Sequence, residues 1–254
     1  MTRFIGFGIS SVLCGVLAAV GCAAPRAPAP SIPQQPAATA ADSTRRPPDV
    51  GYHMRASFWD SLEARDALIA GDLARAQKAA DRLAQTDYAA VLPADWMHWT
   101  AQLQQRAGEL SLAADLSSAA QALGRIALVC GECHELHKAG PAHPRVQPLP
   151  WEDPPEELDV RMQRHQQGIE QMWDGLVLPS EQAFRTGTVT ITRAPLRAPE
   201  QAATPIDEAL KTRIEEVRAL AKDARRATTY EERGRVYGEL ISRCAQCHYS
   251  QRPQ

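Results

Sequence analysis

Apolar residues recur at intervals of three and four through most of the chain after residue 51, and this pattern predicts amphipathic helices. Between residues 52 and 138 it predicts four helices in succession. Gly71 suits the C-cap of the first of these helices and Asp72 the N-cap of the second. The fourth has the most regular apolar stripe: Leu112, Leu116, Ala119, Leu123, Ile126, Cys130 and Cys133. The alternating steps of four and three residues are typical of a bundle seam, so the two cysteines continue the buried face.

The region from residue 157 to 252 repeats this plan with changes. Pro179 is expected to end or bend its first helix, because proline cannot donate the next backbone hydrogen bond. The run Thr186–Thr192 is β-like in composition and is expected to form an extended stretch or a loop. Thr228 and Glu231 form a capping-box pattern that predicts the start of the last helix. The second set of helices is therefore expected to be less regular than the first.

Two short stretches share the pattern C-x-x-C-H, the signature of covalent haem attachment. Two thiols each add to a vinyl group of one haem, and the histidine beside the second thiol ligates the iron. On a helix the three side chains fall at i, i+3 and i+4 and so share one face. The sequence thus predicts two covalently bound haem c groups, attached at Cys130, Cys133, Cys244 and Cys247 and ligated on the proximal side by His134 and His248.

A zinc or dithiol protein is the alternative without haem. A four-cysteine zinc site normally pairs its C-x-x-C units closely, whereas more than a hundred residues separate Cys133 from Cys244. A thioredoxin-like motif would need a βαβ setting, which the pattern does not provide. The two cysteines outside the motifs, Cys14 and Cys22, lie in the first 22 residues, so none remains for a structural disulfide.

The two halves read as an old duplication. Aligning Met54 with Met162, an offset of 108, also matches Asp66–Ile69 with Asp174–Val177. The two C-x-x-C-H motifs are offset by 114, and a difference of six residues needs only one or two loop changes.

The N-terminal region predicts export. Arg3 precedes an uncharged apolar run, and the small residues before Cys22 resemble a bacterial lipobox, in which Cys22 is lipidated. A plain signal peptide cut nearby and a short retained anchor are the alternatives, and both also place the protein outside the cytoplasm. Ala23 follows Cys22 where an aspartate would signal retention at the inner membrane, so the expected location is the periplasm-facing outer membrane of a Gram-negative bacterium.

Proline-rich stretches divide the chain further, because they cannot form regular hydrogen-bonded structure. The expected divisions are a signal peptide with lipobox (1–22), a Pro/Ala-rich tether (23–50), a first haem domain (51–140), a linker (141–156) and a second haem domain (157–254). Lysine and arginine number 28 against 30 acidic residues, with no basic block, so no nucleic-acid partner is expected.

Each motif ends its own run of helices, and in this respect the chain resembles two tandem class II c-type cytochromes, the cytochrome c-prime group. Lys138 and Arg252 match a basic residue common in that group four places after the haem histidine. The resemblance covers residues 52–252 and implies an all-α protein of two antiparallel four-helix bundles. Bundles of this class often pair, so a homodimer is one arrangement that the resemblance allows.

The sixth iron ligand would decide the chemistry. Low-spin members of the group use a methionine near the start of the first helix, which makes Met54 and Met162 candidate distal ligands, with core packing as the alternative role. His53 and His165 are rival ligands.

The leading interpretation is a dihaem electron carrier, not an enzyme, that serves redox proteins of the periplasm and reaches the membrane through its lipid anchor. An open distal site would instead favour binding or sensing of NO or CO. A dihaem peroxidase-type enzyme is the third interpretation, and no acid/base constellation in the sequence supports it.

Overall fold

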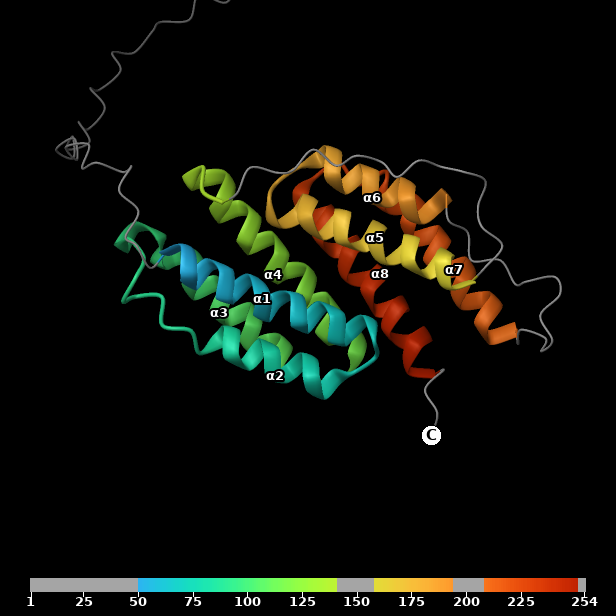
Figure 1. Cartoon of the computed structure of the whole chain (residues 1–254), viewed down its shortest axis with the longest axis horizontal. Coiled ribbons are helices and arrows are strands. Elements are labelled where there is room, and N and C mark those ends of the chain that lie inside the picture. Colours follow the sequence, from blue (N-terminus) through green and yellow to red (C-terminus); the bar gives the residue numbers. More distant parts are fainter. Residues whose placement is uncertain (1–49, 141–157, 194–207, 251–254) are drawn as a thin grey trace, which may run out of the picture. The chain divides into compact units, whose positions relative to one another are not determined.

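The computed structural model describes residues 50–140, 158–193 and 208–250, and every regular element in these ranges is helical (Figure 1). The all-α expectation is confirmed for these residues. The helices are α1 (Val50–Ile69), α2 (Leu73–Ala84), the 3-10 helix η1 (Ala94–Trp96), α3 (Met97–Ser111), α4 (Leu116–His137), α5 (Leu158–Val177), α6 (Glu181–Arg193), α7 (Glu208–Ala224) and α8 (Tyr230–Ser250). The export signal with Cys22, the tether and the linker were predicted for residues outside the described ranges, apart from Val50 at the end of the tether.

Helices α1 to α4, here called the first half, pack on one another in sequence, and α4 also returns to α1. The predicted turn between α1 and α2 is confirmed: Gly71 has φ +72°, and the Asp72 side chain accepts a hydrogen bond from the Arg75 backbone N–H. The buried stripe of α4 includes Ala119, Leu123 and Ile126. Leu112 was expected in this stripe but is exposed, because α3 ends at Ser111 and α4 begins only at Leu116.

Helices α5 to α8, the second half, repeat this order of contacts, with α8 returning to α5. The prediction of an extended stretch at Thr186–Thr192 was wrong, since these residues belong to α6. The hydroxyls of Thr190 and Thr192 donate to backbone carbonyls one turn earlier, and the Thr190 hydroxyl also meets Gln171 of α5. Local hydrogen bonds and burial therefore override the β-like composition.

The last helix begins with a capping box one residue later than predicted. Thr229 Oγ1 accepts from the Glu232 backbone N–H, and the Glu232 carboxylate accepts from the Thr229 N–H at 3.0 Å. Thr228 donates both its backbone N–H and its hydroxyl to the same carboxylate, at 2.8 Å and 3.2 Å. Because the N-cap and N3 residues must be three apart, Thr229 with Glu232 fits the start of α8 at Tyr230.

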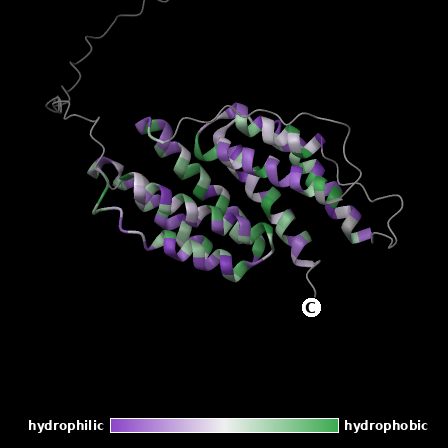
Figure 2. Ribbon diagram, viewed as in Figure 1, coloured by the Kyte–Doolittle hydropathy of each residue, from purple (hydrophilic) through white to green (hydrophobic). Residues whose placement is uncertain are grey.

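The two halves meet along α4 and α8, where glycines let the backbones approach closely. A methyl group on Gly124 would overlap the carbonyl oxygen of Gly234, and one on Gly238 would lie 2.9 Å from the carbonyl oxygen of Ala120. Residue numbers thus rise along α4 as they fall along α8, so the two helices are antiparallel, and apolar residues line this contact (Figure 2).

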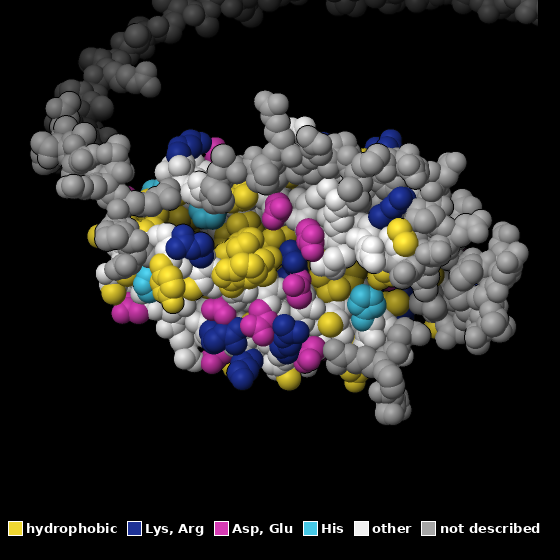
Figure 3. Space-filling view, viewed as in Figure 1, with side chains coloured by type: hydrophobic (Ala, Val, Ile, Leu, Met, Phe, Trp, Pro, Cys, Tyr) yellow, Lys and Arg dark blue, Asp and Glu magenta, His cyan; other side chains and the backbone are white. Residues whose placement is uncertain are grey.

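The outer surface over α1 and α2 carries charges of both signs (Figure 3). Arg82 pairs with Asp60 at 2.7 Å and with Glu63, which also pairs with Arg75. Within the described ranges, no helix has the length and apolar character needed to cross a bilayer.

Candidate functional site

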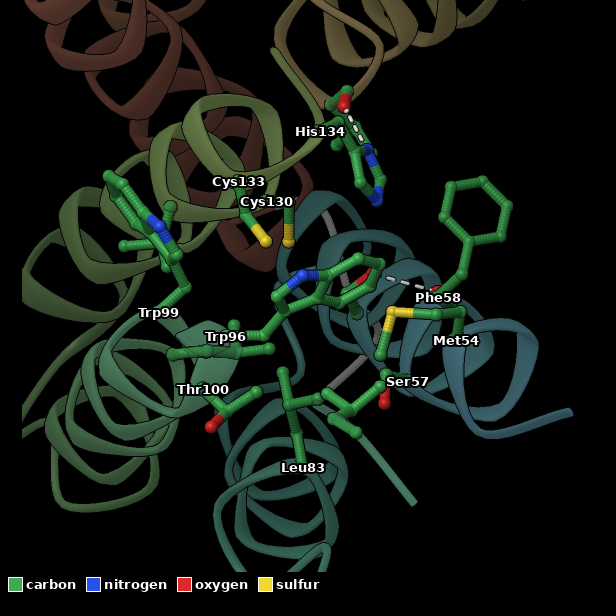
Figure 4. A pocket seen from close by; sticks show the side chains of 15 residues that line it. Met54, Ser57, Phe58, Leu83, Trp96, Trp99, Thr100, Cys130, Cys133 and His134 are labelled. Carbon is green, nitrogen blue, oxygen red and sulfur yellow. Dashed lines mark hydrogen bonds between the residues drawn. The ribbon is translucent and has the colours of Figure 1, made fainter. Parts of the chain in front are cut away.

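The first C-x-x-C-H motif opens onto a cavity. Cys130, Cys133 and His134 lie on one face of the last turns of α4, and all three line this cavity (Figure 4). In the close-up, the two sulfur atoms point to the same side. The helical spacing of the motif therefore brings its three reactive groups to one place, as the sequence predicted.

The rest of the cavity wall comes from helices in both halves of the protein. Met54 and Phe58 come from α1, Trp96 and Trp99 from η1 and α3, and Val177 from the end of α5. The cavity measures about 70 Å³, and most of the residues that line it are apolar, as is usual for a cofactor site.

Burial keeps the motif thiols protonated. It raises the pKa of Cys130 to about 12 and that of Cys133 to about 11, and the neighbouring Cys133 adds to the effect at Cys130. At the second motif, burial raises the pKa of Cys244 to about 12, with a smaller effect of Cys247. Because metal ions bind thiolates, neutral thiols suit a preformed metal site poorly.

The ring of His134 is fixed by a hydrogen bond from the other half of the protein. Its Nδ1 donates to the backbone carbonyl oxygen of Val177 at 2.7 Å, since a carbonyl can only accept (Figure 4). This bond assigns the proton to Nδ1 and the lone pair to Nε2, the tautomer that a metal-ligating histidine needs.

The second motif has the same arrangement with the halves exchanged. Cys244, Cys247 and His248 lie in the last turns of α8. His248 Nδ1 donates to the backbone carbonyl oxygen of Ile69, at the end of α1, at 2.5 Å. Ile69 and Val177 are the residues that the 108-residue offset matches, so the two hydrogen bonds are equivalent under the sequence repeat.

The two motifs lie at opposite ends of the α4–α8 pair. Tyr230, the first residue of α8, packs against Gly131 of the first motif, and Cys244 follows 14 residues later. Fourteen helical residues span about 20 Å along the axis. The two sites are therefore separate, and the α4–α8 contact fixes their spacing.

The candidate distal ligands differ in their position and burial. Met54 lines the cavity of the first motif, as a distal ligand would. Met162 is half-buried near the start of α5, and its role stays a prediction. His53 packs edge-on against the exposed Tyr52, whereas His165 is buried. Ser57, the counterpart of His165 in the repeat, lines the first cavity, which keeps His165 a candidate in the second half.

Trp96 lines the cavity and packs its ring against His137, with 4.6 Å between ring centroids. Two other residues of the site could not be identified from the sequence. Ile69 and Val177 act through their backbone carbonyls, which no residue pattern marks. The matched ends of α1 and α5 in the repeat were the available signal.

No family model, curated protein or solved structure matches this chain. Within the ranges that the structure describes, no three His, Cys, Asp or Glu side chains come together in a way that could hold a metal ion by themselves.

Proposed function

We propose that the chain is a c-type haem protein with two haem groups, one at each C-x-x-C-H motif. The observation that carries this proposal is the convergence of two protonated thiols and a histidine with its Nδ1 proton already engaged on one apolar cavity. A thiol that adds to a vinyl group forms a thioether bond. A histidine that carries its proton on Nδ1 can ligate iron through Nε2. Cys130 and Cys133 with His134 would hold one haem, and Cys244 and Cys247 with His248 the other.

Within this class, the particular function we propose is electron transfer. A haem bound at such a site changes between Fe(III) and Fe(II) by one electron. The residues of the chain would hold the group, supply donor atoms to the iron and exclude water from one side. Phe58, Trp96 and Trp99 form the apolar wall that would do so at the first motif. Met54 in the same cavity supports a six-coordinate iron, because thioether ligation favours electron carriers.

The tandem class II architecture belongs to the same proposal. It is supported by the return of α4 to α1 and of α8 to α5, so that each motif-bearing helix packs on the first and third helices of its own half. The export signal with lipidation at Cys22 would place the protein in the periplasm, tethered to the outer membrane, where its redox partners would be other exported proteins.

The test begins with the intact mass and the optical and EPR spectra of the full chain produced with a haem-attachment system. We expect the mass of two covalent haems and low-spin iron, with a methionine–iron charge-transfer band if Met54 ligates. A chain that carries zinc and no haem would contradict the proposal.

Carbon monoxide added to the reduced protein separates carrier from sensor. Slow or substoichiometric binding is expected if both irons have protein ligands on both sides. Prompt binding at both haems would favour the NO/CO-binding alternative, for which the distal positions must be open.

A further inference from the structure

The proximal histidine of each half is held by the other half. His134 of α4 donates to Val177 of α5, and His248 of α8 donates to Ile69 of α1. We propose that these reciprocal hydrogen bonds make each half set the histidine basicity, and hence the reduction potential, of the haem site in the other half. This inference rests on the proposed haem function.

The acceptor carbonyls are available because of how α1 and α5 end. A helix leaves its last four carbonyls without partners inside the helix. In the turn after α1, the Asp72 N–H donates to Ala67 and the Gly71 N–H to Leu68, both at 2.8 Å, in the pattern of a Schellman motif. The next carbonyl, that of Ile69, has no donor within this turn and accepts from His248.

The turn after α5 follows the same plan with one change. The Ser180 N–H donates to the carbonyl of Gly175 at 2.9 Å, the equivalent of the Asp72 bond. Pro179 stands where the first half has Gly71 and has no N–H, so it cannot donate to Leu176. The hydroxyl of Tyr230, from α8, donates to Leu176 instead, and His134 donates to the next carbonyl, Val177.

Each turn is also packed against the helix that carries the histidine. Gly71 lies so close to α8 that a Cβ atom there would come within 2.8 Å of the Tyr249 backbone nitrogen, next to His248. Tyr230 packs against Gly131, which lies in α4 between the two cysteines of the first motif. The turns therefore fix the position of the motif as well as the histidine proton.

The chemical consequence follows from the hydrogen bond. A histidine that donates its Nδ1 proton to a carbonyl is a stronger electron donor through Nε2, and such donation favours the oxidised iron. Weakening the bond should raise the reduction potential of that one haem. The acceptor carbonyl and the histidine lie in different halves. A change at the turn of one half should therefore shift the potential of the haem attached to the other half.

Gly71→Ala and Gly71→Asn test the first-half turn. Both add a Cβ against Tyr249, while asparagine tolerates the positive φ better than alanine and so protects folding. The potential of the Cys244/Cys247 haem should rise and that of the other haem should stay unchanged. Gly108→Ala is the matched control, because a Cβ at Gly108 meets no atom within 4 Å.

Tyr230→Phe tests the second-half turn with little risk to folding. It should raise the potential of the Cys130/Cys133 haem alone, and Tyr52→Phe, at an exposed tyrosine, should shift neither potential. The two potentials are assigned in the full chain with a Cys130→Ala/Cys133→Ala variant, which keeps only the second haem. If both Gly71 variants fail to fold, the potentials measured in Tyr230→Phe decide whether the proposal holds.

A second measurement reads the hydrogen bonds without redox chemistry. In ¹⁵N-histidine spectra of the chain without haem, the Nδ1–H signal of His248 should change only in the Gly71 variants and that of His134 only in Tyr230→Phe. In the haem-loaded protein, this inference alone would be overturned if the Gly71 variants shifted the potential of the Cys130/Cys133 haem and Tyr230→Phe that of the Cys244/Cys247 haem. It would also be overturned if the variants shifted neither potential. Absence of haem in the intact mass would overturn the proposed function, and the histidine spectra would still report on the reciprocal bonds.

Discussion

Replacing Gly124 by alanine should loosen the contact that joins the two halves. Gly124 lies in α4 directly over the backbone of α8, where an added Cβ would overlap the Gly234 carbonyl oxygen and lie 3.3 Å from the Gly238 nitrogen. Both neighbours are backbone atoms, so no side chain can rotate away. The helices must therefore separate to accommodate the methyl group.

Two opposing terms set the magnitude. Alanine is favoured over glycine in a helix interior by about 1 kcal/mol. Overpacking a tight contact costs about 1–3 kcal/mol, and rigid backbone neighbours place this site toward the upper end. Gly108→Ala in α3 should show the helix term alone, because its Cβ has open space. We therefore expect Gly124→Ala to be about 2–3 kcal/mol less stable than Gly108→Ala.

Urea unfolding of the full chain, followed by circular dichroism, measures this difference. The midpoint should fall in Gly124→Ala with an unchanged slope, since the slope reports the surface exposed on unfolding. If the two alanine variants unfold within about 0.5 kcal/mol of each other, the close approach of α4 and α8 is not a constraint on the fold.

Three further outcomes are expected. Cys130→Ala/Cys133→Ala should lose the mass of one haem and keep the other, which the intact mass checks; loss of both would mean that the motifs are not independent attachment sites. Met54→Ala should open one of the two irons to carbon monoxide in the reduced protein, and unchanged binding would remove Met54 as a ligand. Burial raises the pKa of Tyr88 to about 12 in spite of its 2.8 Å hydrogen bond to Ser57. Because the folded pKa exceeds the ordinary value of 10.0, the stability that Tyr88 contributes is present below pH 10 and is lost as the pH rises toward 12. The free energy of unfolding should therefore fall less between pH 9 and pH 11 in Tyr88→Phe than in the unmodified chain. Equal falls would contradict a raised pKa for Tyr88.

The features that the sequence could predict are the local ones. Apolar spacing located the helices, Gly71 and Asp72 marked a turn, and the C-x-x-C-H spacing placed three groups on one helix face. Each depends on residues a few positions apart. The threonine run in α6 was misjudged because composition says nothing about which carbonyls the hydroxyls reach, or about the close packing of α6 on α5 at Gly168 and Gly187.

The reciprocal hydrogen bonds show why the remainder of the site lay beyond sequence reasoning. A duplication alone predicts two equivalent sites, each complete within its own half. The structure instead places a wall residue, Val177, and the acceptor for His134 in the second half, and the acceptor for His248 in the first. This exchange requires α4 and α8 to be antiparallel and nearly in backbone contact, which glycines in both helices allow. Every residue has a backbone carbonyl, so the sequence cannot show which carbonyl accepts a hydrogen bond. Only the packing of the helices shows that each motif needs the other half to complete its site.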